Sequence, residues 1–351
     1  MRAPKKEPRG FAAVAGIVLL LGAFAAHPVR SQGDLPPSFY ALGPMPGATA
    51  NGTYANGLSA DGSTVVGYGW VNGHTHAFRW TASDGYDVIG AGTDSRAHAA
   101  SFDGGVVVGQ ANFRAFRWTR ETGMIEWPIL HALGVSADGH ALAGMNVRWT
   151  ASNIWTELGA LGRGGQTSAY GISADGDVVV GFSETPRGDA HAFRWTASTG
   201  MRDLGVTTGT ESLAWGVSGD GHVVFGEARS TAGYWRAFRW TASQGMRDLG
   251  TLGGPMSTAH GASRDGAVIV GKSAIDGLTT SPRAFCWTPS AGMRDVRQLL
   301  LDAGVTSVQH WILSVAAGVS DDGTVIAGWG FSPNHTWEPW IAVIPARGNW
   351  Y

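Results

Sequence analysis

Seven Asp-Gly pairs of the form Ser-x-Asp-Gly are the most frequent pattern in this chain that could do chemistry, because each places a carboxylate in a short loop. A serine lies two residues before each aspartate, and an apolar run follows each glycine. Calcium loops of the D-x-D-x-D-G type need several oxygen donors at alternating positions. Here a second carboxylate precedes the aspartate only in the last pair, at Asp321. We therefore interpret the pairs as tight turns, in which Asp caps the backbone and Gly adopts a positive φ. The aspartates are Asp61, Asp103, Asp138, Asp175, Asp220, Asp265 and Asp322.

Signatures of catalysis are absent from the sequence. It contains no G-x-S-x-G elbow, no H-E-x-x-H motif, no phosphate-binding loop and no Cys/His cluster with metal-ligand spacing. Cys286 is the one cysteine, so no internal disulfide can form. It stands where five other copies of a repeat carry Arg, which indicates a substituted strand position rather than a nucleophile. We predict no catalytic residue, no cofactor and no metal.

The Asp-Gly pairs mark a repeat whose successive offsets are 42, 35, 37, 45, 45 and 57 residues. These lengths are close to that of one propeller blade. Each copy predicts four short strands: A-x-G-V-S before the turn, V-V-V-G after it, then A-F-R-W-T and G-M-R-D-L-G. Within A-F-R-W-T at 192–196, Phe193 and Trp195 share one face of the strand and Arg194 the other. We expect this recurrent Arg to pair with a carboxylate or a carbonyl in or between blades.

The two ends of the repeat array predict a closed ring. The seventh copy has its third strand around 340–344 and no fourth strand after it. The segment 39–43, FYALG, resembles that missing strand and has nothing before it. Pairing the two would close the ring and leave no exposed radial end. We predict an all-β, seven-bladed β-propeller of four-stranded blades over residues 38–346, with a C-terminal tail at 347–351. A β-helix is the alternative.

The N-terminal segment predicts export. Four basic residues precede an uncharged apolar run of about 16 residues, which is shorter than the roughly 20 that span a membrane. We interpret residues 1–25 as a cleaved secretory signal and 26–37 as a linker; an uncleaved anchor is the alternative. Cleavage would remove those four basic residues and Glu7, which lowers the net charge by three, from −2 to −5. The expected product is secreted or periplasmic, without nucleic-acid binding or stable membrane insertion.

Several motifs resemble the HAF repeat family of probable extracellular repeat proteins. The H-A-F triplet occurs at 76–78 and 191–193, and M-R-D-L-G-T-L-G-G spans 246–254. The resemblance covers nearly all of the chain after the signal, with departures in the second, third and seventh copies. It implies an extracytoplasmic, β-rich repeat protein and no established reaction, substrate or cofactor.

Candidate binding residues lie where the copies differ. The second-to-third and fourth-to-first connections vary in length and would share one rim of the propeller, where binding surfaces concentrate. A second set is the x of A-x-G in the innermost strand, which would either ring the central channel or pack between blades; packing between blades is the favoured interpretation. From both sets we select as candidate ligand-binding residues Trp70, His74, His98, Tyr170, Trp215, Tyr234, Trp235, His260 and Trp337.

Three functions remain open at this level. The favoured one is a monomeric, non-enzymatic binding or scaffold propeller that recognises a protein or a glycan through the variable rim. The alternatives are an extracytoplasmic polysaccharide hydrolase or lyase and a structural component of the envelope. The connection 296–313 contains an apolar stretch and is expected to form a short helix or a lid over the variable rim.

Overall fold

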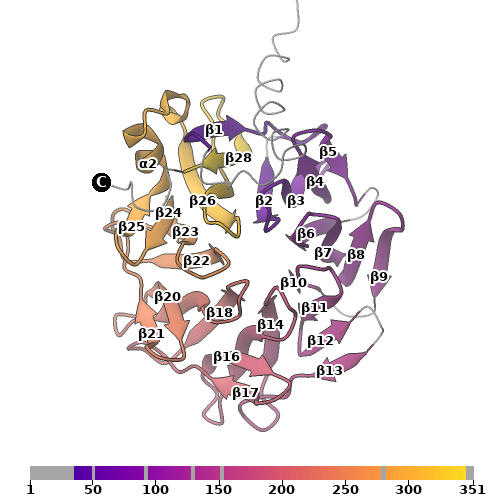
Figure 1. Cartoon of the computed structure of the whole chain (residues 1–351), viewed down its shortest axis with the longest axis vertical. Coiled ribbons are helices and arrows are strands. Elements are labelled where there is room, and N and C mark those ends of the chain that lie inside the picture. Colours follow the sequence, from indigo (N-terminus) through magenta and orange to yellow (C-terminus); the bar gives the residue numbers. More distant parts are fainter. Residues whose placement is uncertain are drawn as a thin grey trace, which may run out of the picture.

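The computed structural model describes residues 35–49, 52–90, 94–127, 131–150, 154–277 and 282–344. Within these ranges, seven four-stranded antiparallel sheets are arranged around a central axis as the blades of a propeller (Figure 1). The predicted seven-bladed propeller is therefore confirmed. The predicted signal at 1–25, most of the linker and the tail at 347–351 lie outside the described residues. None of the helices in the described ranges has the length and hydropathy of a membrane span.

Blades are numbered here by the order of their innermost strands. Blade 1 comprises β2 (Thr53–Leu58), β3 (Thr64–Val71), β4 (His74–Thr81) and β5 (Gly85–Val88). Blade 2 comprises β6 (Ser95–Ala100), β7 (Val106–Ala111), β8 (Arg114–Thr119) and β9 (Gly123–Trp127). Blade 3 comprises β10 (Gly134–Val135), β11 (Ala141–Gly144), β12 (Val147–Thr150) and β13 (Trp155–Glu157). Blade 4 comprises β14 (Thr167–Ile172), β15 (Val179–Glu184), β16 (Ala190–Thr196) and β17 (Gly200–Asp203).

The remaining blades complete the circle. Blade 5 comprises β18 (Ser212–Val217), β19 (Val224–Arg229), β20 (Trp235–Thr241) and β21 (Gly245–Asp248). Blade 6 comprises β22 (Ser257–Ala262), β23 (Ile269–Ser273), β24 (Arg283–Thr288) and β25 (Gly292–Asp295). A helix, α2 (Val296–Asp302), and a 3-10 turn, η3 (Thr306–Val308), lead to blade 7. Blade 7 comprises β26 (Ile312–Val319), β27 (Val325–Phe331), β28 (Trp337–Val343) and, as its outermost strand, β1 (Ser38–Ala41).

Both faces of each blade are buried, which explains the lack of a polar face in the second strands. Strand β16 illustrates the arrangement. Phe193 and Trp195 point into a cluster that contains Ala141 of blade 3, whereas Ala192 belongs to a cluster with Phe238 of blade 5. The propeller thus has a separate apolar core at each junction between blades rather than one common core.

The Ser-x-Asp-Gly segments form the predicted turns. In all seven, the serine Oγ donates to the aspartate Oδ1 at 2.5–3.1 Å, and the backbone N–H two residues after the aspartate donates to the same oxygen. The backbone N–H three residues after the aspartate then donates to the serine Oγ. The carboxylate therefore satisfies donors of its own turn, as expected for turn chemistry.

These turns are linked to one another by a closed belt of seven backbone hydrogen bonds, one at each junction between blades. In each, the backbone N–H of the turn aspartate or of the residue before it donates to a carbonyl of the next turn, at 2.7–3.1 Å. The acceptor is the carbonyl of the residue before the aspartate. For example, Phe102 donates to Ala137, and Ala137 donates to Ala174. The last bond, from Asp321 to Ala60, returns to blade 1. Rigid turns thus fix the position of each blade relative to its neighbours.

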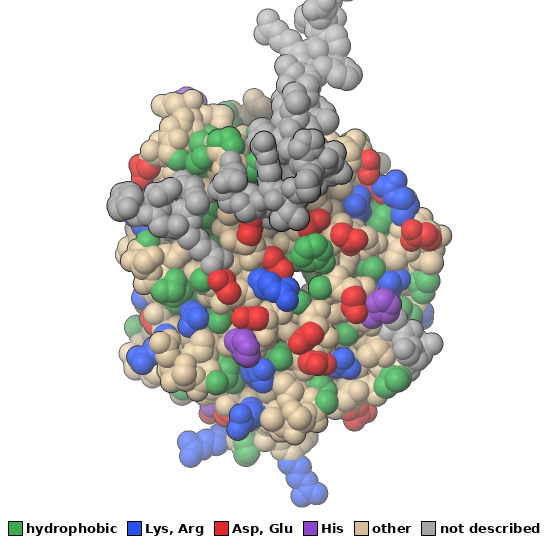
Figure 2. Space-filling model, viewed as in Figure 1, with side chains coloured by type: hydrophobic (Ala, Val, Ile, Leu, Met, Phe, Trp, Pro, Cys, Tyr) green, Lys and Arg blue, Asp and Glu red, His purple; other side chains and the backbone are tan. Residues whose placement is uncertain are grey.

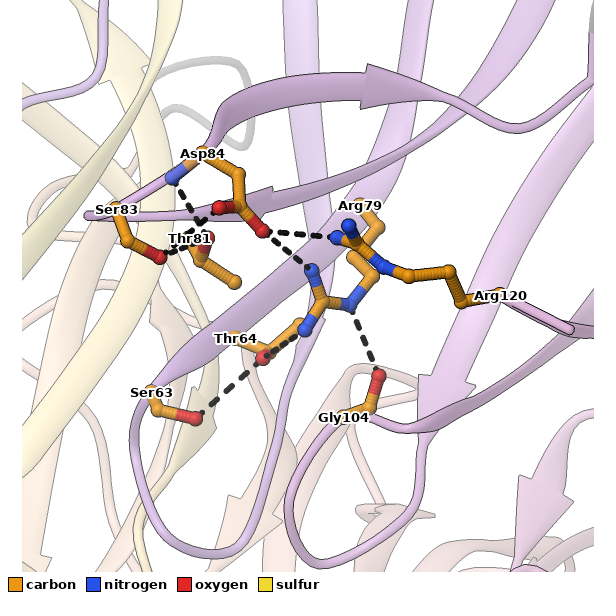
Figure 3. A network of polar contacts seen from close by, with 8 residues as sticks. All are labelled: Ser63, Thr64, Arg79, Thr81, Ser83, Asp84, Gly104 and Arg120. Carbon is orange, nitrogen blue, oxygen red and sulfur yellow. Dashed lines mark hydrogen bonds and ion pairs between the residues drawn. The ribbon is translucent and has the colours of Figure 1, made fainter. Parts of the chain in front are cut away.

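The recurrent Arg of the third strand reinforces this belt, as predicted. Arg79 donates from Nε to the carbonyl of Gly104 in the turn of the next blade at 2.9 Å, and it also lies 3.8 Å from Asp84 (Figure 3). Arg148, Arg194 and Arg239 make the corresponding bond to the next glycine. Burial lowers the pKa of Arg79. Four of the five Arg residues therefore satisfy turn carbonyls across the junctions between blades, whereas Nε of Arg117 in blade 2 has no hydrogen-bond partner among the described residues.

Closure occurs as predicted, because β1 pairs with β28 in antiparallel register from Ser38 with Val343 to Ala41 with Trp340. The first and last strands of the colour scale therefore lie side by side in Figure 1. Phe39 of β1 is 7% exposed and contacts Trp311 edge-on, with ring centroids 5.2 Å apart. Both ends of the chain thus contribute to one blade.

The connection after blade 6 forms the expected helix but not a lid. Leu299 and Leu300 of α2 are buried in a cluster with Trp340 and Cys286, and the helix packs against β24, β25 and β26. The apolar stretch of this connection is therefore used inside the ring wall, so the lid interpretation is wrong. At the Arg position of the third strand, blade 6 has Cys286, which belongs to this cluster, and blade 7 has Ile341, which is buried in the cluster at the junction with blade 1. Apolar packing replaces the Arg bond at these two positions.

The closing strand gives a first prediction. Phe39→Ala should lower the free energy of unfolding by about 3–5 kcal/mol, because it leaves a cavity against Trp311 and Trp340. Val88→Ala on the exposed outer strand of blade 1 is the matched control and should cost less than about 1 kcal/mol. Urea unfolding followed by tryptophan fluorescence measures both. Equal effects would show that β1 does not close the ring.

The belt gives a second prediction through two glycines with positive φ. A Cβ at Gly176 would lie 2.7 Å from the Cβ of Ala141 in blade 3, whereas a Cβ at Gly200 meets nothing within 4 Å. Both Ala variants suffer left-handed strain of about 1–2 kcal/mol. Gly176→Ala should cost about 1–3 kcal/mol more in unfolding free energy, because it also forces the blades apart. Similar losses for the two variants would contradict the importance of close packing at the turns.

Candidate functional site

Two connected cavities follow the propeller axis. The one on the side of the Asp-Gly turns has a volume of about 240 Å³, and the one on the side of the variable connections about 430 Å³. Both are lined by the seven x residues of A-x-G, so these residues form the waist between the cavities. The favoured interpretation from the sequence, packing between blades, is therefore wrong for this set. The waist residues are Asn56, His98, Leu133, Tyr170, Trp215, His260 and Ala317.

A β-bulge turns the waist residues toward the axis. In β2, Ala55 pairs with Gly67 and Gly57 with Val66, which leaves Asn56 without a partner in the ladder. The same shift occurs at x in β6, β14, β18, β22 and β26. An extra residue in one strand is redirected out of the normal alternation of side chains. Simple alternation along the strand therefore does not place these residues correctly.

The turn-side cavity opens through an acidic mouth. Its lining includes the residues that precede the turn aspartates, among them Phe102, Ala137 and Asp321. Figure 2 shows acidic side chains gathered around the opening of the channel. Arg264 lies among them, 3.3 Å from the carboxylate of Asp321. Because the turn aspartates accept hydrogen bonds inside their own turns, this mouth is a structural ring that also carries negative charge.

Aromatic side chains make one wall of the waist. Tyr170 and Trp215, from blades 4 and 5, are stacked with ring centroids 4.7 Å apart and an interplanar angle of 16°. Phe182 of β15 lies behind Tyr170 at 5.8 Å. Flat, stacked rings that face a cavity provide rigid apolar surface for a ligand. Both residues belong to the set of x residues of A-x-G that was selected from the sequence.

Two histidines of the waist are held neutral. Burial, together with the nearby charge of Lys272, lowers the pKa of His260 to about 3. Burial also lowers the pKa of His98 to about 4, with smaller contributions from His131 and Arg96. Both rings are thus uncharged at neutral pH and offer one donor and one acceptor nitrogen each.

A second tier of side chains lies above the waist on the loop side, and Trp329 of this tier lines the loop-side cavity. Tyr54 and Tyr68 are stacked 5.3 Å apart, and Trp329 meets Tyr54 edge-on at 5.1 Å. The guanidinium of Arg96 lies 4.8 Å from the ring centre of Tyr68, a cation–π geometry. Lys272 of β23 also lines this cavity. The mouth on this side is therefore aromatic, with basic groups.

The structure brings together only part of the predicted site. His98, Tyr170, Trp215 and His260 meet at the waist, and Trp337 adjoins the cavity through Trp329 at 5.4 Å. The other four candidates line neither axial cavity. Trp235 packs under Arg229, with 4.9 Å from the guanidinium to the ring centre, and His74 lies 3.5 Å from Asp94. Trp70 is half-buried in β3, and Tyr234 is exposed next to Trp235.

Sequence reasoning missed the residues that follow the V-V-G of the second strands. Tyr68, Lys272 and Trp329 occupy this position, and each reaches the loop-side part of the channel or its aromatic wall. The signal was present, since this position varies between copies as much as the x of A-x-G. Antiparallel pairing, as between Tyr54 and Tyr68, places it beside the tier above the waist.

The described residues contain no group of three or more His, Cys, Asp or Glu side chains arranged to hold a metal ion. Among those that line the two cavities, only Asp321 carries a carboxyl group, whereas glycosidases use two. What this lining offers is aromatic surface, neutral hydrogen-bonding groups and one ammonium.

Comparison with known proteins assigns no family to this chain. No protein-family model and no curated protein matches the chain. Among solved structures, it is similar to TolB from Acinetobacter baumannii at 12% identity and a TM-score of 0.48, over 67% of this chain and 63% of that one. It is also similar to a putative TolB from Agrobacterium tumefaciens at 12% identity and a TM-score of 0.43, over 84% and 91%. Likeness at this identity concerns the fold and not the function. Membership of the HAF repeat family stays a prediction.

The neutral histidines give a third prediction. A His whose pKa is lowered by folding binds its proton more readily when unfolded, so stability falls as the pH drops below about 6.5 toward 4. Replacing His98 and His260 together by Gln should therefore flatten the decline in melting temperature between pH 7 and pH 5. Wild type and variant are compared by thermal unfolding in one buffer series. Parallel curves would show that these rings are solvated.

Proposed function

We propose that this protein is an extracytoplasmic, non-enzymatic binding propeller that recognises a protein or a glycan at the loop-side mouth of its channel. One observation carries the proposal: the innermost-strand positions that differ most between copies converge on a single waist. The extracytoplasmic location rests on the signal pattern of the first 25 residues.

The division between constant and variable positions supports binding. Residues present in every copy, such as Ser173, Asp175 and Gly176, serve the turn and the belt. Residues that change between copies line the cavities instead. Variable side chains on a rigid scaffold are the usual arrangement of a recognition surface. The loop-side volume of about 430 Å³ also falls within the range of ligand pockets.

An aromatic path leads from the rim into the channel. Phe331 contacts Trp337 at 5.2 Å, Trp337 contacts Trp329 at 5.4 Å, and Trp329 contacts Tyr54 at 5.1 Å. These rings come from the β27–β28 hairpin of blade 7 and from the innermost strand of blade 1. Such a path fits an elongated ligand that lies over the rim and inserts one end into the cavity.

Binding is tested with the full chain against arrayed glycans and solubilised envelope fractions. Trp215→Leu should weaken any ligand by tenfold or more, since it removes half of the stacked pair at the waist. Trp235→Leu, an aromatic of the same rim outside the cavities, is the matched control and should bind like the parent. If the affinity fell only in Trp235→Leu, the binding site would lie on the outer rim. Absence of any ligand for the parent would refute the binding function.

A further inference from the structure

Lys272 is an unusual residue in this chain, because it is the only lysine after residue 6; all other later basic side chains are Arg or His. It lies on β23 of blade 6, paired with Thr258, and is the one charged residue that lines the loop-side cavity. No carboxylate of the described residues lies within 4 Å of its ammonium. A cation that lines a cavity without an ion-pair partner is a candidate for ligand recognition.

The nearest acidic group does not neutralise Lys272 by contact. Glu227 of β19 accepts a hydrogen bond from the Thr258 hydroxyl at 2.7 Å. Burial raises the pKa of the Glu227 carboxyl, whereas the Thr258 bond and the charge of Lys272 oppose that shift. Glu227 is thus engaged with the junction of blades 5 and 6 and does not line the cavity. The cavity side of Lys272 is left for a ligand.

His260 supplies a second, independent feature beside Lys272. Its Nε2 is buried and has no hydrogen-bond partner. A buried polar atom without a partner costs about 1–3 kcal/mol, and native structures rarely leave one unexplained. Because His260 lines both cavities, a polar atom of a ligand in the channel can satisfy it.

We propose that the loop-side cavity binds a carboxylate-bearing saccharide, with the carboxylate between Lys272 and His260 and the sugar ring against the Tyr170–Trp215 wall. This inference rests on the binding function proposed above and specifies its ligand class. The carboxylate pairs with the ammonium and accepts from His260, while the ring C–H groups meet the negative faces of the aromatic rings.

The charge distribution along the channel favours an anion that enters from the loop side. Arg96 and Lys272 lie on that side of the waist, where Glu227 is the acidic neighbour. The turn-side mouth is ringed by carboxylates and would repel the same ligand (Figure 2). Flat aromatic walls with neutral groups such as Asn56 and His98 favour a sugar over an acidic peptide.

The test uses calorimetry on the full chain with oligomers of galacturonate, glucuronate and N-acetylneuraminate, the neutral galactose oligomer and triglutamate. At least one acidic saccharide should bind, tenfold or more tightly than the neutral oligomer, and more weakly as salt rises. Lys272→Met should lower the affinity for the acidic saccharide by tenfold or more, and Lys272→Arg should retain most of it. Arg163→Met, an exposed cation of the β13–β14 connection, is the control and should bind like the parent.

The single lysine also offers a direct readout of the site. Reductive ¹³C-methylation labels Lys272 as the only lysine of the folded part, and its methyl NMR signal should shift on addition of the acidic saccharide. Three results would overturn the proposed ligand class: equal binding of neutral and acidic oligomers, unchanged affinity of the Lys272→Met variant, or a preference for triglutamate. None of these results would contradict the proposed binding function. If none of the acidic saccharides binds, the ligand class is likewise overturned. Failure of every ligand, including envelope fractions, would refute the binding function itself.

Discussion

The structure depends on the belt of backbone hydrogen bonds that joins the seven Asp-Gly turns. Each bond uses an N–H and a carbonyl that a tight turn would otherwise leave to water, and the bond from Asp321 to Ala60 makes the series circular. Because an uninterrupted circle cannot be opened at one junction without straining the others, the belt fixes the spacing of all the innermost strands. The internal hydrogen bonds of the turns, from serine to aspartate and from backbone to both, hold those groups in place.

Departures from the repeat are compensated where they occur. At the junctions after blades 6 and 7, Cys286 and Ile341 stand in place of the Arg that bonds to the next turn in blades 1, 3, 4 and 5. Cys286 is buried in the cluster formed with α2 and Phe39, and Ile341 in the cluster between blades 7 and 1, so apolar packing takes over the role of a polar bond. The insertion that creates α2 and the strand that closes the ring therefore act on the same part of the molecule. Blade 7 is assembled from both ends of the chain and has the largest such cluster.

Much of the fold could be predicted from the sequence because the repeat encodes it locally. The Asp-Gly turns, the Arg bonds and the closing strand at Phe39 all follow from residue types and their order. The site was harder to predict for a physical reason. Alternation along a strand decides which face a residue occupies, yet in six of the seven blades a bulge breaks the alternation at x. The rim candidates Trp70 and Tyr234 lie outside the axial cavities for another reason, since a variable position on the rim need not reach the axis.

The bulge also explains how one hairpin can combine a constant turn with a side chain at x that varies between blades. Residue x, such as Tyr170, lies four positions before the belt residue of the same turn, Ala174. Because x is outside the ladder, its side chain does not set the register of the sheet, and it can change without disturbing the turn. The belt in turn holds the seven x residues at fixed positions around the axis, so seven different side chains form one preorganised lining. Rigidity at the turn-side mouth and diversity at the waist therefore arise from the same short segment, and a change of specificity requires a change only at x or at the position after V-V-G.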